Sequence, residues 1–190
     1  MKECALSKPL VLTDLELPVR PLSQHELRPT EPGEENRACW YASALMVLSF
    51  RGPQATLAIN NAYSLQRKAK NDGLYPYELW RLAEEVQLEH ANARAVLPQL
   101  EATDWRDALA TLGPLIVSVG AHAVVVCGIV RRGLDWHIVF NDPMRGARRT
   151  MVMPRFNSLV NWSMQFLYRR SALRPPVAQM RPNMRPLDAL

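Results

Sequence analysis

Cys39 is followed directly by Trp40 and stands at the start of an apolar, helix-compatible run, NRACWYASALMVLSF. A helix N-terminus offers unpaired N–H groups and the positive end of the helix dipole, and both stabilise a thiolate. Cys39 therefore has the position that a nucleophile needs, although a buried structural cysteine would fit the same place. The choice depends on whether the fold brings a histidine and an orienting group to the thiol.

Four histidines compete for the role of general base. His25 lies in a proline-rich N-terminal stretch and His90 follows a predicted helix in a polar loop, so we expect both to be exposed to solvent. His137 stands in the middle of a predicted strand among valines and isoleucines, which indicates packing. His122 stands at the start of a strand, where its ring can project into a cleft, and is the better candidate.

The group that orients His122 is predicted from a β-hairpin formed by residues 122–130 and 136–142. A turn centred near Arg132 sets His122 opposite Asn141–Asp142. Directly opposed residues have Cβ atoms about 4.5–5.5 Å apart, so an Asp or Asn there reaches one ring nitrogen and leaves the other for a thiol. A slip of one residue would change the pairing.

The other two cysteines, Cys4 and Cys127, suggest no chemistry of their own. The hairpin register sets Cys127 opposite His137 on the other face, which we interpret as a packing position. No CxxC motif and no Cys/His ligand spacing is present, so a zinc site is not expected. An odd number of cysteines indicates a reducing compartment or one free reactive thiol.

The elements that must position these residues change in type along the chain. Helix-forming patterns cover residues 38–50, 56–70, a third segment beginning at Pro76 and a fourth that follows Asp104 and ends at Gly113-Pro114. Short β-rich runs come afterwards, at residues 115–119, 122–130, 136–140, 150–153 and 165–170. Helices first and strands afterwards predict an α+β fold, with a helical lobe packed against an antiparallel sheet.

Length and composition predict a single globular domain, because 190 residues with 48% hydrophobic residues fill one core. Prolines mark residues 1–33 as an extended arm with one short strand within 10–17, and residues 174–190 as a flexible tail. The domain itself is expected over residues 34–173. No long apolar stretch is found at the N-terminus, so neither a signal peptide nor a membrane anchor is expected.

The net charge of +5 comes from basic residues that crowd the C-terminal part of the chain, from Arg131 to Arg185. No aromatic-interleaved nucleic-acid motif lies among them. We therefore interpret them as a solvated basic face and expect no specific nucleic-acid binding.

Three blocks, CWYASALMVLS, GPLIVSVGAHAVVVCGIV and FNDPMRG, follow one another in an order that resembles the papain-like cysteine peptidases of bacteria. The resemblance covers about residues 34–169 and is to the short secreted-effector branch, with its plant-pathogen avirulence proteases and toxin domains. It implies that Cys39 is the nucleophile, His122 the general base and Asp142 the orienting residue. It also implies a cleft between a helical lobe and a β-lobe, and no metal or organic cofactor.

The sequence departs from this family at the oxyanion hole. The family has a glutamine five or six residues before the cysteine, but Gly33 and Glu34 stand there. An ionised carboxylate cannot donate a hydrogen bond, whereas Asn36 and the backbone N–H of Cys39 can. These two are the tentative oxyanion donors, and the spacing of Asn36 is short for the role.

Together with the missing signal peptide, the resemblance implies a cysteine peptidase that is made in the bacterial cytoplasm and delivered by a specialised secretion system, as an effector or an antibacterial toxin. Its substrate would be a protein or peptide, and a toxin would require a cognate immunity protein in its producer. The same triad would also serve a glutamine deamidase, a transglutaminase or a peptidoglycan amidase. A non-catalytic module that uses its basic face to bind an acidic partner is the other alternative.

Overall fold

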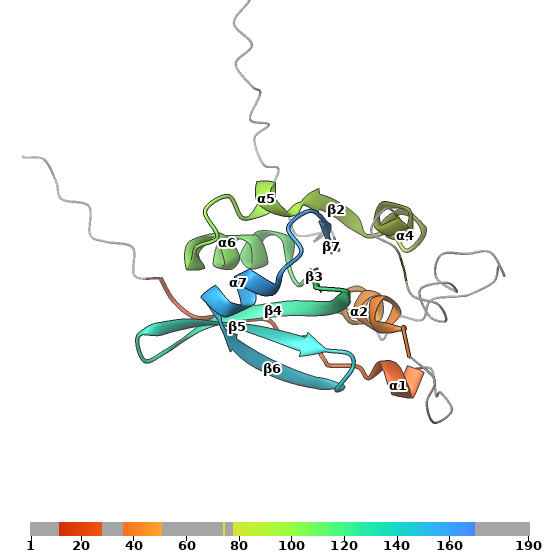
Figure 1. Cartoon of the computed structure of the whole chain (residues 1–190), viewed down its shortest axis with the longest axis horizontal. Helices are drawn as coiled ribbons and strands as arrows, with labels where there is room; N and C mark the ends of the chain where they lie inside the picture. The colour runs from red at the N-terminus through yellow and green to blue at the C-terminus, as the bar shows by residue number, and fades with distance from the viewer. Residues whose placement is uncertain (1–11, 28–35, 51–73, 75–77, 170–190) are drawn as a thin grey trace, which may run out of the picture.

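The computed structural model describes residues 12–27, 36–50, 74 and 78–169 of the chain (Figure 1). Cys4, the predicted helix over 56–70 and the predicted tail over 174–190 lie outside the described residues.

One antiparallel sheet runs through the described chain (Figure 1). Its order is β2-β7-β3-β4-β5-β6, and β1 pairs with β4 outside this path. The strands are β1 (Leu15–Glu16), β2 (Glu89–Asn92), β3 (Leu115–Val119), β4 (His122–Arg132), β5 (Asp135–Asp142), β6 (Ala147–Val152) and β7 (Gln165–Tyr168). The predicted antiparallel sheet is therefore present.

Helices and the sheet pack together as an α+β fold. The helices are α1 (Gln24–Leu27), α2 (Cys39–Leu48), α4 (Leu79–Glu85), α5 (Ala93–Val96), α6 (Ala102–Leu112) and α7 (Met153–Leu159). α2 contacts β3 and β4, α6 contacts β4, and α7 contacts β5 and β6. In Figure 1, α1 and α2 lie at the end of the sheet opposite the β4–β5 turn. Among the described residues, no helix is long and apolar enough to cross a membrane.

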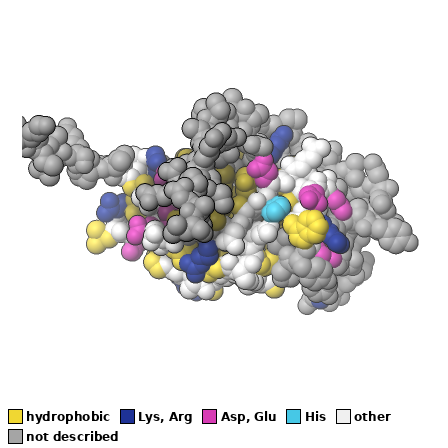
Figure 2. Space-filling view, turned by 90° about the horizontal axis from the view of Figure 1, so that it is seen from above, with side chains coloured by type: hydrophobic (Ala, Val, Ile, Leu, Met, Phe, Trp, Pro, Cys, Tyr) yellow, Lys and Arg dark blue, Asp and Glu magenta, His cyan; other side chains and the backbone are white. Residues whose placement is uncertain are grey.

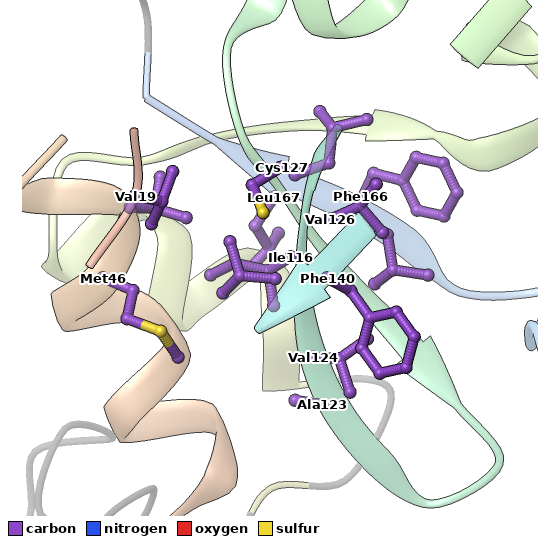
Figure 3. Packing of buried hydrophobic residues seen from close by; sticks show 14 of the residues in the cluster. Val19, Met46, Ile116, Ala123, Val124, Val126, Cys127, Phe140, Phe166 and Leu167 are labelled. Atoms are coloured by element: carbon purple, nitrogen blue, oxygen red, sulfur yellow. The ribbon is translucent and has the colours of Figure 1, made fainter. Parts of the chain in front are cut away.

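Nine of the ten residues of α2, from Cys39 to Val47, are buried. A helix that is apolar all round has no solvent face and is surrounded by the protein core. Figure 3 shows Met46 of α2 with Val19 and Ile116 among the buried side chains that pack between the helix and the sheet. This burial fixes the position of α2, and with it the position of its first residue.

An aromatic cluster ties α6 and α7 to the sheet. The ring of Trp105 lies 5.8 Å from that of Phe156, edge to face, and 6.0 Å from that of Phe166, stacked. Phe140 of β5 lies 5.3 Å from Phe156. Trp105 is fully buried, and its Nε1 donates to Oδ1 of Asn157 at 3.1 Å. Such rings stabilise more than their buried area alone would suggest.

Two predicted boundaries are wrong for identifiable reasons. α6 begins at Ala102, so Asp104 lies inside its first turn and does not precede the helix. From there its carboxylate accepts from the backbone N–H groups of Gln99 and Glu101, which come before the helix, and so caps the helix N-terminus. The predicted strand over 150–153 ends at Val152, and α7 follows at once with a proline in its first turn. α1, β2, α5 and α7 are short elements that the sequence patterns did not predict.

The turn between β4 and β5 is centred beyond Arg132. Arg132 pairs with Asp135, so only two residues join the strands, and Gly133 adopts a left-handed φ of 63°. His137 consequently pairs with Val130 and not with Cys127. The predicted pairing of His137 with Cys127 is wrong because the turn had been placed too early.

A β-bulge interrupts the same hairpin at Cys127, where the register shifts between Val126 and Gly128. One extra residue on β4 is thus accommodated without a partner on β5. Gly128 is also where β1 approaches, since a Cβ added to it would lie 2.8 Å from the carbonyl oxygen of Leu15. The glycine allows the N-terminal segment to pair with β4.

Candidate active site

Cys39 is the first residue of α2 and is 7% exposed. The turn before it is fixed, because the backbone N–H of Ala38 donates to Oδ1 of Asn36 at 3.0 Å. No acidic residue lies in the first turn of α2. Within this turn, therefore, no carboxylate opposes the N–H groups and dipole of the helix end at the thiol.

His122 is the first residue of β4 and pairs with Val119 across a two-residue turn. Gly120 in this turn has a left-handed φ of 59°, its carbonyl accepts from Oγ of Ser118 at 2.8 Å, and its N–H donates to the carbonyl of Leu159 at 3.1 Å. The turn is thereby held at both sides. The side chain of His122 is 25% exposed, so it can meet a substrate.

Nε2 of His122 lies 2.8 Å from Oδ1 of Asp142. The predicted direct opposition of His122 and Asn141–Asp142 is wrong, since Asn141 pairs with Val125. Continuing that register by one residue sets Asp142 opposite Val124, two positions from His122. The two side chains therefore share one face of the sheet and meet diagonally.

The carboxylate of Asp142 accepts further hydrogen bonds besides its bond with the imidazole. The backbone N–H of Met144 donates to Oδ1 at 3.1 Å, and Nη1 of Arg149 donates to Oδ2 at 3.3 Å. Burial alone would raise the pKa of this carboxyl. The bond and charge of His122, then Arg149 and the Met144 N–H, outweigh burial and hold the pKa of Asp142 below its usual value.

The imidazole of His122 has the opposite shift. Burial disfavours its charged form, but hydrogen bonds with Cys39 and with Asp142 outweigh that effect and raise the pKa of His122 above its usual value. Since Nε2 faces Asp142, Nδ1 is the nitrogen left for the thiol. The structure thus brings together the three side chains singled out in the sequence, with the histidine in the middle.

Asn141 points away from His122. Its Nδ2 donates to the carbonyl of Val19 at 3.0 Å, and its Oδ1 accepts from Nε of Arg148 at 3.2 Å and from Sγ of Cys127 at 3.9 Å. The amide therefore holds the N-terminal segment against the sheet. Burial raises the pKa of Cys127 to about 12, so this second thiol stays protonated and unreactive.

Gln24 on α1 is a buried polar residue beside the turn that precedes α2, and the sequence analysis did not single it out. It is 1% exposed, and its Nε2 donates to the backbone carbonyl of Asn36 at 2.6 Å. Nδ2 of Asn36 in turn donates to the backbone carbonyl of Gln24 at 3.1 Å. Its backbone N–H donates to the carbonyl of Pro143, next to Asp142. Its Oε1 is buried without a partner among the described residues. The spacing of five or six residues could not find it, because Gln24 lies fifteen positions before Cys39 in the sequence.

The other histidines lie elsewhere. His25 on α1 and His90 are exposed, as predicted, although His90 belongs to β2 and not to a loop. Nδ1 of His137 lies 3.4 Å from the carbonyl oxygen of Asp135 at the far end of the hairpin.

Charges of both signs are present on the face seen from above in Figure 2, where basic and acidic side chains appear among hydrophobic ones. Arg148 pairs with Glu16 at 2.6 Å and Arg149 with Asp142 at 3.3 Å, so these two cations of the basic C-terminal part are partly neutralised.

Comparison with known proteins gives a matching family and several similar solved structures. A family model described as the papain-like cysteine protease AvrRpt2 matches residues 24–161, a span that includes Gln24 and the three clustered side chains. No curated protein matches the sequence. The crystal structure of UfSP from C. elegans is similar at 10% identity with a TM-score of 0.48. That match covers 86% of this chain and 35% of the other, so this chain spans about a third of its length.

Proposed function

The chain belongs to the papain-like cysteine protease family of AvrRpt2, and on that premise we propose that Cys39, His122 and Asp142 are its catalytic triad. Family membership makes the protein a cysteine peptidase with a papain-like α+β fold, whose substrates are proteins or peptides. The observation that carries the triad is the place of His122, whose Nε2 lies 2.8 Å from the Asp142 carboxylate and whose pKa is raised by both Cys39 and Asp142.

The proposed reaction passes through a thioester. The thiolate of Cys39 attacks the carbonyl carbon of the scissile amide, and the imidazolium of His122 gives its proton to the leaving nitrogen. His122, now neutral, takes a proton from water, whose oxygen attacks the thioester carbon and releases the acid and Cys39. Asp142 holds the ring in one tautomer and stabilises the positive charge whenever it forms.

For the oxyanion hole we propose the backbone N–H of Cys39 together with the side-chain amide of Gln24. The amide cannot be turned around, because the carbonyl of Asn36 only accepts and must face the nitrogen. Nε2 carries a second proton that this bond does not use. Asn36, the tentative donor from the sequence, already bonds through Nδ2 to Gln24, which suits it to hold Gln24 in place.

We further propose that the substrate is a target-cell protein and that the peptidase serves as a secreted effector or toxin, as in the branch that its sequence resembles. The proposed layout keeps residues 34–173 as the catalytic domain and 174–190 as a tail, with Gln24 and β1 of the N-terminal arm packed onto that domain. The described part of the arm contributes to the sheet, since the N–H of Leu17 donates to the carbonyl of Cys127 at 2.7 Å. Deleting the tail should leave Cys39 reactivity unchanged, whereas deleting residues 1–23 should reduce stability.

The test is exposure of a whole-cell protein extract to the wild-type protein and to Cys39→Ala, with new N-termini identified by mass spectrometry. Cleavage sites present only with the wild-type protein support the proposal. Gln24→Ala should reduce turnover by roughly 10²–10³-fold, the cost of one oxyanion donor, whereas Gln24→Glu should not restore it. Glutamine-to-glutamate mass changes without new N-termini would contradict peptide-bond cleavage.

A further inference from the structure

The carboxylate of Asp142 is held by a different element at each oxygen. Oδ1 receives His122 of β4 and the backbone N–H of Met144, whereas Oδ2 receives only Arg149 of β6 among the donors that the structure gives it. Arg149 pairs with Phe140, two residues before Asp142, so its side chain reaches diagonally along the same face of the sheet.

We propose that Arg149 is a positioning residue that holds Oδ2 of Asp142, so that Oδ1 stays aimed at His122. This inference rests on the proposed triad. A carboxylate bonded at one oxygen still rotates about its Cβ–Cγ bond, but a second bond from a different strand fixes its plane. The side chain of Asp142 is 9% exposed, so water does not replace the arginine easily, while the side chain of Arg149 is 45% exposed.

The charge of Arg149 has a separate effect from its hydrogen bond. The charged groups that face Asp142 are His122 from β4 and Arg149 from β6, and Cys39 acts on it through His122. Removing the guanidinium removes one cation, so the carboxyl of Asp142 should take up a proton at higher pH than in the wild-type protein.

Three substitutions separate the two effects. Arg149→Ala loses both the donor and the charge, Arg149→Gln retains a donor without charge, and Arg149→Lys retains both. Arg145→Ala is the matched control, because Arg145 is an exposed cation on the turn between β5 and β6, whose backbone N–H bonds to the Asp142 carbonyl. Circular dichroism checks that every variant is folded.

Two measurements read the outcome without a known substrate. The first is the titration midpoint of the Asp142 carboxyl carbon by NMR, with the signal identified by its absence in Asp142→Asn. The second is the rate at which iodoacetamide alkylates Cys39 at neutral pH. Arg149→Ala should raise the midpoint and slow alkylation by about two- to fivefold, the size expected for a partly exposed charged pair. Arg149→Lys should keep both the titration midpoint and the alkylation rate near their wild-type values, whereas Arg149→Gln should keep only the alkylation rate. The control Arg145→Ala should change neither quantity.

An unchanged midpoint in folded Arg149→Ala would show that the contact with Oδ2 does not exist in solution. A raised midpoint with an unchanged alkylation rate would make Arg149 a counter-ion only and overturn its positioning role. Failure of the proposed function gives a different result, since Cys39 would then react no faster than an ordinary thiol in the wild-type protein itself.

Discussion

His122 and Asp142 meet diagonally across two strands, with Nε2 of the ring 2.8 Å from Oδ1 of the carboxylate. The turn at Gly120, directly before His122, is fixed by the bond from Ser118. The carboxylate of Asp142 is held by the backbone N–H of Met144 and by Arg149 of β6. A proton acceptor placed this way is ready before substrate arrives, which reduces the reorganisation that the reaction requires.

Cys39 should be the fastest-reacting thiol of the protein. It combines a helix N-terminus with a hydrogen-bonded imidazole, whereas burial holds Cys127 protonated. Iodoacetamide at neutral pH, followed by peptide mapping, should find Cys39 modified well before Cys127 or Cys4. Equal rates at the three thiols in the folded protein would contradict the nucleophile assignment.

His122→Ala should reduce turnover by at least about 10²-fold, since a general acid–base group contributes at least that much. His137→Ala is the control, because His137 lies in the same hairpin and its ring bonds only to the backbone carbonyl of Asp135 among the described residues. Turnover and thermal unfolding are measured for both variants. A folded but inactive His137→Ala beside an active His122→Ala would reverse the assignment.

Asp142→Ala should reduce turnover, though less than Cys39→Ala does, and Asp142→Asn should be milder because an amide still accepts from the ring. Asn141→Ala should instead reduce stability by about 1–3 kcal/mol, because it leaves the buried carbonyl of Val19 without one of its donors. Turnover and urea unfolding of the three variants decide the matter. Loss of turnover in a stable Asn141→Ala would assign the orienting role to Asn141.

Stability should depend on pH through His122 and Asp142 in opposite directions. The folded-state pKa of His122 is raised, so its contribution is complete below its unfolded pKa and is lost as pH rises through the folded value. The pKa of Asp142 is lowered, so its contribution is present above its unfolded value and is lost as pH falls through the folded one. Urea unfolding across pH should show the free-energy difference between wild type and His122→Gln shrinking toward alkaline pH. A constant difference would mean that the His122 shift is absent.

Gly128→Ala should destabilise the protein by about 1–3 kcal/mol, because the added methyl group meets the backbone of β1 at 2.8 Å. Gly120→Ala has open space around its Cβ and should cost only the left-handed backbone penalty of about 1–2 kcal/mol. Thermal unfolding measures both. If residues near Leu15 were not paired with β4 in solution, Gly128→Ala would be tolerated.

Local patterns were sufficient to predict the helix that begins at Cys39, the strand over 115–119 and the antiparallel sheet, because each depends on a short run of residues. The predicted hairpin register was wrong by two residues near His122. Two is an even number, so the expected face of the sheet was still right, which is why Asp142 was chosen correctly as the neighbour of His122.

Gln24 and Arg149 could not be found in the same way. Gln24 is held beside the turn before α2 by its contacts with Asn36 and Pro143, and Arg149 reaches Asp142 only after β6 pairs with β5. Both contacts form only in the tertiary structure, whereas a sequence pattern reports only on residues that are close along the chain.

The bulge at Cys127 determines which of two adjacent side chains serves His122. Counted from the Gly133-Leu134 turn alone, the pairing of Arg132 with Asp135 would carry on to set Asp142 opposite Val125, on the face away from the imidazole. The unpaired residue reverses this alternation before the strand reaches its catalytic end. If the two strands paired regularly, without the bulge, the same sequence would therefore place the carboxylate of Asp142 on the face away from His122, and the triad would be broken with every one of its residues still present.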